Sequence, residues 1–364
     1  MKRRSFLKGS AAAGLATTAV AAPAIAQSMP ELKWRLATSW PKSLDTISGT
    51  IERFAKAVGE MTDQRFQIRV FAPGEIVPAL QVLDAVQAGT IEMGGSAGSV
   101  FFGKNPAFGF DTGLPFGMNS RQHASWLLYG GGTELIRPLY KEFNTIQFPM
   151  GATGAQMGGW YRKEINSPED LKGLKFRIGG FPGRIFLKVG GVPQGIPGGD
   201  VYPALERGAI DGAEWVGPYD DEKLGFNKVA KYYYYPAWWE PGSILSLFVN
   251  LPQWEALPKM YKQVVQSAAN EAILLNLALY DNVNPPALRR LVASGTILKP
   301  FPRSVMETCY AAAMELYDEL AAESPHFKRI YEPWKAYRAE QHLWFRVAEN
   351  TSDSFMYSVS AKQQ

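Results

Sequence analysis

The stretch SPEDLKGLKFRI, at residues 167–178, decides the fold class. It opens with a serine that can cap a helix, a proline that fits the first helical position and an acid placed to complete a capping box. The apolar residues at its end alternate with charged or polar ones, and this period of two predicts a β-strand. A helical turn that leads directly into a strand is typical of proteins in which helices cover a β-sheet.

A second stretch, GDVYPALERGAIDGAEW at residues 199–215, continues this alternation of helix and strand. Residues 200–207 have the pattern of a short helix, and Gly208 is suited to end it because glycine tolerates a left-handed backbone. Residues 209–213 then predict another strand. A similar helix–glycine–strand corner occurs at residues 85–92, which fits either two related α/β lobes or two ordinary corners.

The N-terminal part of the chain adds a strand–helix–strand unit. Residues 33–38 and 66–70 alternate as strands, and apolar residues recur at helical spacing over residues 47–61 between them. Asp45 is placed to cap that helix. This order of elements favours a parallel sheet with covering helices.

The C-terminal half is predicted to be mainly helical. After a buried strand at residues 243–250, a long helix is predicted from residue 258 to about 282. It should end before Pro285 and Pro286, because proline lacks the amide hydrogen and clashes with the preceding turn. Two further helices are predicted near residues 304–322 and 327–347.

The composition describes a large folded protein. The chain has 364 residues, 46% hydrophobic and 20% charged, which excludes a disordered chain and permits a large core. The single cysteine, Cys309, excludes an intramolecular disulfide and a thiolate metal cluster. With only three histidines, we do not expect histidine-rich metal chemistry.

Residues 1–26 predict an export signal. Arg3 and Arg4 precede a soft stretch of Gly, Ala and Val and a small-x-small cleavage site before Gln27, which resembles a cleaved twin-arginine signal for export to the periplasm. This segment holds four basic residues and no acidic ones, and the remaining chain has 34 basic and 34 acidic residues. The neutral mature chain offers no basic tract for a nucleic acid.

Arg177 is the first candidate site residue. It lies near the carboxyl end of a predicted strand, and in open α/β sheets ligands bind beyond such ends. The planar donor fork of arginine suits a carboxylate. A salt bridge to a neighbouring acid is the commoner use of such a residue.

Two glutamates beside tryptophans form the second group of candidates. Glu214 precedes one tryptophan and Glu240 follows two. A carboxylate is costly to bury alone, so each either pairs with a lysine or arginine or binds a hard cation through oxygen. Gln156, in the Gly-rich run GATGAQMGGW, could add a neutral oxygen ligand.

Two other patterns leave alternatives open. Six aromatic residues lie within residues 232–239 and could wall a ligand cleft, fill the core or form a partner surface.

The run GGSAG at residues 94–98 matches the G-x-S-x-G of serine hydrolases, with Ser96 as nucleophile. That chemistry needs a helix directly after the serine. The residues that follow are a poor helix start, so a secreted serine hydrolase is only the alternative reading.

Together these motifs resemble the periplasmic solute-binding proteins of TRAP transporters. The resemblance covers nearly the whole mature chain, and Gln156, Glu214 and Glu240 point to the members that bind α-keto acids, also called 2-oxo acids. It rests on the export signal, on residues 167–178 and 199–215, and on ALQVLDAVQAGTIEMG (79–94) and FVNLPQWEALP (248–258).

The resemblance implies a two-lobed α/β periplasmic binding protein, type II-like, with strands that cross between the lobes and a long helix that spans both. Residues 27–150 and about 245–285 would form lobe I. Residues from about 151 to 244 and residues 286–325 would form lobe II, and residues 326–364 a C-terminal helical extension. The protein would be a receptor and not an enzyme. It would deliver its ligand to membrane permease subunits and could form a homodimer through its C-terminal helices.

The resemblance also implies a site. Arg177 would clamp the carboxylate of a pyruvate-like 2-oxo acid, and Trp40 and Phe101 would wall the cleft. A cation, typically sodium, would bridge ligand and protein. Its protein ligands would be Gln156, Glu214, Glu240 and the backbone oxygen of Trp215. Lactate, another hydroxy acid or a dicarboxylate is the alternative ligand on the same scaffold.

Charge counting leaves the identity of the cation open. A monocarboxylate, Arg177, Glu214 and Glu240 sum to −2, which calcium would neutralise and sodium would leave at −1. Uncompensated buried charge is costly. Sodium therefore comes first by resemblance and calcium second by charge.

Overall fold

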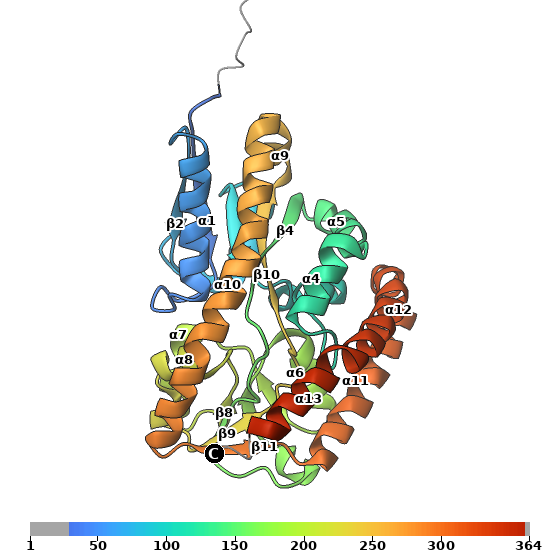
Figure 1. Cartoon of the computed structure of the whole chain (residues 1–364). Coiled ribbons are helices and arrows are strands. Elements are labelled where there is room, and N and C mark those ends of the chain that lie inside the picture. The colour runs from blue at the N-terminus through green and yellow to red at the C-terminus, as the bar shows by residue number, and fades with distance from the viewer. Residues whose placement is uncertain (1–28, 361–364) are drawn as a thin grey trace, which may run out of the picture. The chain divides into compact units, whose positions relative to one another are not determined.

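The structure, a computed structural model, describes residues 29–360 (Figure 1). The predicted twin-arginine signal at residues 1–26 lies outside the described residues. The single cysteine, Cys309, is completely buried in the core. Among the described residues, none of the helices combines the length and the apolar character needed to cross a bilayer.

Two β-sheets organise the unit that begins at Glu31. The first is built from β1 (Leu32–Thr38), β2 (Phe66–Phe71), β3 (Met93–Ser96), β4 (Thr145–Ala152) and β10 (Ile244–Asn250), in the order β2-β1-β3-β10-β4. The second is built from β5 (Trp160–Tyr161), β6 (Lys175–Arg177), β7 (Val192–Gln194), β8 (Gly212–Ala213), β9 (Tyr232–Tyr235) and β11 (Ile297–Pro300), in the order β11-β9-β5-β8-β6-β7. We call the parts around these sheets lobe I and lobe II, and this two-lobed α/β fold is the fold class that the sequence predicted.

Lobe I begins with the predicted strand–helix–strand unit. β1 and β2 pair in parallel, and α1 (Ile47–Met61) connects them with a buried apolar face. The predicted helix cap is wrong: Thr46 occupies the capping position, and Asp45 accepts hydrogen bonds from Tyr219 and Lys223 of lobe II. A contact with the other lobe has replaced the local bond. The other helices and turns of lobe I are η1 (Ala79–Gln81), α2 (Val82–Gln87), η2 (Gly98–Phe101), η3 (Pro106–Phe108), α3 (Gly109–Thr112), α4 (Ser120–Tyr129), α5 (Gly132–Glu142) and α9 (Leu251–Ala256).

Lobe II contains the two stretches that decided the fold. The capping box at Ser167 is present, although the turn after it, η4 (Pro168–Leu171), is a 3-10 helix. Gly208 follows α7 (Gly198–Glu206) with φ +70°. The sequence predicts a strand at residues 209–213, but the observed strand β8 contains only the last two of them. The amides of Ala209 and Ile210 instead donate hydrogen bonds to the carbonyl of Ala204. The remaining elements of lobe II are α6 (Gly180–Lys188), α8 (Pro218–Lys223) and η5 (Phe226–Lys228).

One helix spans both lobes (Figure 1). α10 (Lys259–Ala293) packs against β4 and α1 of lobe I and against α8 of lobe II. The predicted helix end is wrong, because α10 continues through Pro285 and Pro286. Contacts with α8 support the helix at this point: Asn284 accepts a hydrogen bond from the amide of Tyr219 at 3.1 Å.

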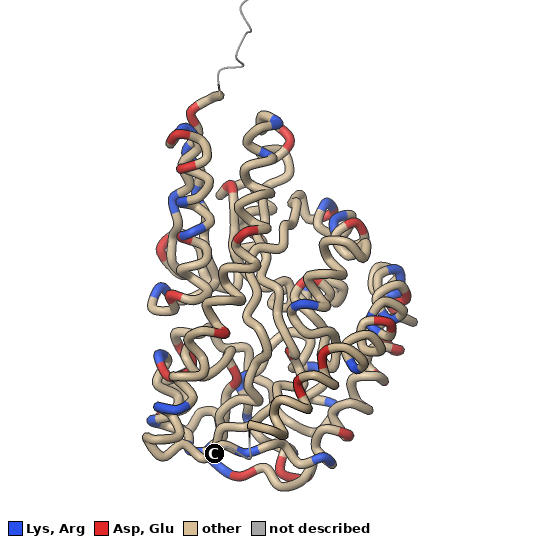
Figure 2. The backbone as a smooth tube through the Cα atoms, in the orientation of Figure 1, with Lys and Arg blue, Asp and Glu red and all other residues tan. Residues whose placement is uncertain are grey.

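The last helices lie along both lobes. They are α11 (Arg303–Glu323), α12 (Pro325–Val347) and α13 (Glu349–Ser360). α11 packs on α6 of lobe II, and α12 packs on α4 and α5 of lobe I. In the view of Figure 2, basic and acidic residues are interspersed along the outer helices, in keeping with the neutral composition. The residue boundaries predicted for the two lobes and the extension remain a prediction.

Candidate functional site

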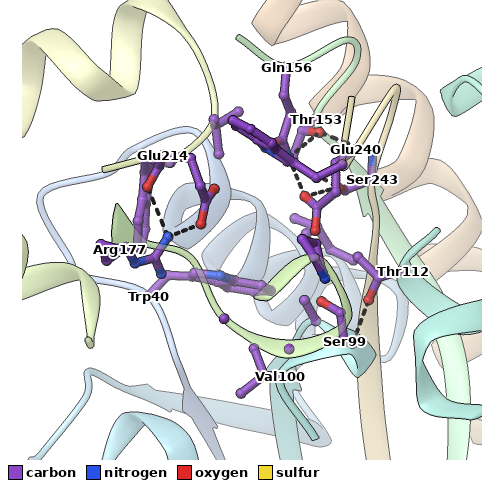
Figure 3. A pocket seen from close by; sticks show the side chains of 18 of the residues that line it. Trp40, Ser99, Val100, Thr112, Thr153, Gln156, Arg177, Glu214, Glu240 and Ser243 are labelled. Atoms are coloured by element: carbon purple, nitrogen blue, oxygen red, sulfur yellow. Dashed lines mark hydrogen bonds and ion pairs between the residues drawn. The ribbon is translucent and has the colours of Figure 1, made fainter. Parts of the chain in front are cut away.

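A cavity of about 200 Å³ lies between the lobes (Figure 3). Lobe I contributes Trp40 and the η2 turn, and lobe II contributes Arg177 at the end of β6 and Glu214 just after β8. The segments that connect the two sheets contribute a polar group. That group comprises Thr153, Gln156, Glu240 and Ser243. The cavity is thus assembled from segments that are far apart in the sequence.

Arg177 and Glu214 form a largely buried ion pair on one side of the cavity (Figure 3). Parallel pairing of β6 with β8 sets Arg177 beside Ala213, so that its guanidinium reaches the residue that follows. The Nη1 group donates to the Glu214 carboxylate and, at 2.9 Å, to the Glu214 carbonyl, while Nε donates to the carbonyl of Ile196 at 3.1 Å. The guanidinium carbon lies 4.8 Å from the centre of the Trp215 ring.

Burial raises the pKa of the Glu214 carboxyl to about 8, and the nearby charges of Glu240 and Asp221 add to the shift. The attraction of Arg177 opposes it. Glu240 is also buried, and burial raises its pKa as well. Two carboxylates that are costly to ionise therefore lie close together, with Arg177 as the nearby positive charge.

The opposite side of the cavity carries a network around Gln156. Its amide nitrogen donates to Glu240 at 2.7 Å, to Ser243 at 3.0 Å and to Thr153 at 3.3 Å. Ser243 also donates to Glu240. Within the described part of the chain, the buried amide oxygen of Gln156 has no hydrogen-bond partner.

This donor set suits a hard cation. An unpartnered amide oxygen and two buried carboxylates that line the same cavity offer neutral and charged oxygen ligands, which sodium and calcium both accept. Residues 29–360 contain no cluster of three or more His, Cys, Asp or Glu side chains suited to a metal. The predicted set uses two carboxylates, one amide oxygen and one backbone oxygen, so it does not need such a cluster.

Three tryptophans contribute to the apolar part of the cavity wall. Trp40, Trp215 and Trp239 line it, so the aromatic run at residues 232–239 contributes one wall residue. The other members of that run divide between core and surface, since Tyr233 and Tyr234 are buried and Tyr235 is exposed.

Phe101 is not a wall residue, contrary to the prediction. It packs against Phe108 and Phe248 in the core of lobe I, with only 3% of its surface exposed. The preceding residues, Ser99 and Val100, line the cavity instead. A 3-10 turn directs successive side chains to different sides, so the correct segment was identified with the wrong residue.

The structure therefore brings six of the seven predicted residues to one cavity. They are Trp40, Gln156, Arg177, Glu214, Trp215 and Glu240. Sequence reasoning missed Thr153 and Ser243, which bond to Gln156 and lie within three residues of a predicted ligand. This spacing of three residues from Gln156 and from Glu240 was the sequence signal that could have identified them. The roles of these residues toward a ligand or a cation remain predictions.

Ser96 lies at the end of β3, and its surroundings are not those of a nucleophile. It is completely buried, accepts a hydrogen bond from Ser39 at 2.7 Å, and is followed by the 3-10 turn η2. A hydrolase serine requires an exposed position before an α-helix.

Comparison with known families decides what kind of protein this is. The family model "Bacterial extracellular solute-binding protein, family 7" matches residues 36–324. The chain belongs to this family. Family-7 proteins are periplasmic receptors of TRAP transporters, which confirms the class predicted from the sequence and excludes the serine hydrolase alternative.

Three relatives of this family-7 chain are informative. A protein from Nostoc sp., named a monocarboxylate 2-oxoacid-binding periplasmic protein, is 49% identical and covers 98% of this chain and 100% of its own length. A solved TRAP solute-binding protein from Bordetella bronchiseptica is 50% identical, with a TM-score of 0.91, over 92% of this chain and 100% of its own. It is a mixed-occupancy dimer with copurified calcium and picolinate in one site.

A third family-7 relative, from Pseudoalteromonas atlantica, contains sodium and pyruvate. It is 36% identical, with a TM-score of 0.86, and covers 89% of this chain and 99% of its own. Relatives of this chain therefore hold a small organic acid together with either of the two cations that the sequence predicted.

Proposed function

We propose that this protein binds a pyruvate-like 2-oxo monocarboxylate, together with a cation, as the periplasmic receptor of a TRAP transporter. The observation that carries the proposal is the unpartnered amide oxygen of Gln156 in a cavity that the buried carboxylates of Glu214 and Glu240 also line. A cation in this position would be held by Gln156, Glu214, Glu240 and the backbone oxygen of Trp215. It would also attract a 2-oxo acid, which presents two oxygens to one ion.

Arg177 would change partners when the ligand binds. In the structure it neutralises the Glu214 carboxylate, which is costly to bury alone. A cation would take over that neutralisation and leave the guanidinium available for the carboxylate of the acid. Cation and acid should therefore bind with positive coupling, because each reduces the cost of binding the other.

The charge of the site does not decide between sodium and calcium. The relatives support both ions, since one holds calcium with picolinate and the other holds sodium with pyruvate. We propose sodium first, as implied by the resemblance, and calcium as the alternative.

Tryptophan-fluorescence titration of refolded, ligand-stripped protein with pyruvate tests the proposal. The titration is run in metal-depleted buffer, then with sodium, then with calcium. We expect saturation that depends on one cation. Saturation without any cation would contradict the proposed metal site. The absence of a response to any organic acid would contradict the proposed ligand class. Competition with lactate and succinate tests the hydroxy-acid and dicarboxylate alternatives.

Arg177→Ala tests the carboxylate clamp in the same assay. We expect pyruvate affinity to fall at least about tenfold, because a charge-assisted bidentate contact is lost. An affinity within a factor of two of the wild type would show that Arg177 only pairs with Glu214.

Two further properties belong to this proposal. Export would use the twin-arginine signal at residues 1–26, and replacement of Arg3 and Arg4 by lysine should stop secretion.

A homodimer would form through the exposed apolar side chains of α12 and α13. These include Leu343, Trp344, Val347, Phe355, Met356 and Tyr357. Size-exclusion chromatography with light scattering tests the dimer, and a monomer at micromolar concentration would contradict it.

A further inference from the structure

A group of contacts joins the two lobes outside the ligand cavity. Thr46, just before α1 of lobe I, donates a hydrogen bond of 2.6 Å to one carboxylate oxygen of Asp220 in α8 of lobe II. Tyr280 of the spanning helix α10 donates a bond of 2.6 Å to the other oxygen. All three side chains are completely buried, so the bonds are shielded from water.

A second layer of contacts lies over the first and is open to solvent. Lys223 at the end of α8 donates to the Asp45 carboxylate at 2.6 Å, and the hydroxyl of Tyr219 donates to its other oxygen at 3.1 Å. The Asp45 side chain is 61% exposed and that of Lys223 is 31% exposed. None of the residues in either layer lines the cavity.

The helix that makes these contacts is fixed to the cavity wall. α8 begins shortly after Trp215, and one oxygen of Asp221 accepts from the amide of Val216 at 3.3 Å. Its other oxygen accepts from the buried side chains of Trp160 at 2.9 Å and Tyr233 at 2.7 Å. A movement of the Trp215 loop therefore moves α8 with it.

We propose that Asp45 and Thr46 of lobe I and α8 of lobe II form a latch that engages when the lobes close. A receptor closes on its ligand because the closed state makes contacts that the open state lacks. Contacts between the lobes that form only on closure add to ligand affinity even though they do not touch the ligand. The inference rests on the proposed function, since it needs a ligand that drives closure.

A double-mutant cycle on the exposed layer tests the latch. Asp45→Ala, Lys223→Met and the double variant are compared with the wild type for pyruvate affinity in the presence of the supporting cation. We expect each single substitution to weaken binding about two- to fivefold, the range for one exposed ion pair. The double variant should be no weaker than the more affected single variant, because the two residues act through one contact. Raising the salt concentration should shrink the effect.

The same helix offers a matched control. Glu222 of α8 pairs with Arg290 in the C-terminal part of α10, and this pair joins α8 to α10 instead of to Asp45 or Thr46. Glu222→Gln and Arg290→Met should leave pyruvate affinity unchanged.

The outcomes separate the latch from the proposed function. Wild-type protein that does not bind pyruvate with either cation contradicts the proposed function. Wild-type protein that binds, with unchanged affinity or independent effects in the Asp45 and Lys223 variants, overturns the latch. Coupling that appears only in the thermal stability of the ligand-free protein also overturns it, since the pair would then exist in the open state.

Discussion

At the scale of single residues, Arg177 has a partner within the protein itself. Its ion pair with Glu214 and its contact with the Trp215 ring hold the guanidinium at the end of β6. Glu240 has no such cation in bonding contact, and only Gln156 and Ser243 donate to it among the described residues. Burial of this carboxylate is therefore tolerated at a cost that a bound cation would remove.

Glu240→Gln tests this view of the residue. The variant should lose about 10- to 100-fold or more in pyruvate affinity with the supporting cation, because a charged ligand of the ion is removed. Its free energy of unfolding without ligand should not fall, since the substitution removes a buried charge. Titration and urea unfolding check the two expectations. Ser243→Ala, which keeps the charge, is the control, and unchanged cation dependence in Glu240→Gln would contradict the assignment.

At the scale of elements, the lobes approach each other closely where α6 begins. Gly180 has φ +58°, and a Cβ atom on it would lie 2.3 Å from the carbonyl oxygen of Ser99 in η2. This glycine is needed both for its backbone conformation and for the close approach of the opposite lobe.

Gly180→Ala should therefore hinder closure. We expect at least about a tenfold loss of pyruvate affinity, corresponding to about 1.4 kcal/mol, with circular dichroism unchanged. Gly199→Ala in α7 is the control, since a Cβ there has nothing within 4 Å and the residue does not line the cavity. Wild-type affinity in Gly180→Ala would mean that the ligand-bound state does not bring these turns together.

The elements also show what the sequence could and could not predict. The capping box at Ser167, the strand that contains Arg177 and the long helix after residue 258 follow from local patterns, and the structure contains them. The pairing of Arg177 with Glu214 depends on the register of β6 and β8, which no local pattern contains. The continuation of α10 through Pro285 and the loss of the cap at Asp45 have a similar cause, because contacts with α8 override the local preference.

At the scale of the whole molecule, several buried carboxyls have raised pKa values. Burial is the main cause, and the pKa reaches about 6 for Asp111 and Asp220, about 7 for Asp221 and about 8 for Glu214. The folded protein therefore keeps protons that the unfolded chain has lost. His123 shifts the proton balance in the opposite direction. Burial lowers its pKa to about 4 from an ordinary value of 6.5, so the folded protein loses this proton at a lower pH than the unfolded chain does.

The ligand-free protein should accordingly lose stability as the pH rises from 6.5 to 8. In this window the unfolded state binds fewer protons than the folded state, so the free energy of unfolding falls with pH. His123 opposes this slope in the lower part of the window and fades above it, because the unfolded side chain has an ordinary pKa of 6.5. Urea unfolding at four pH values measures the slope, and Glu214→Gln should reduce it. A free energy of unfolding that increases from pH 6.5 to 8 would contradict the pKa shifts.

The burial of Cys309 has a practical consequence for measuring motion in this molecule. Burial raises the pKa of its thiol to about 12, so hardly any of the reactive thiolate form exists at neutral pH. Maleimide dyes and spin labels should therefore ignore it in the folded protein. One new cysteine on the surface of each lobe would give a doubly labelled receptor without removal of the native residue, and the distance between the labels would report opening and closing directly.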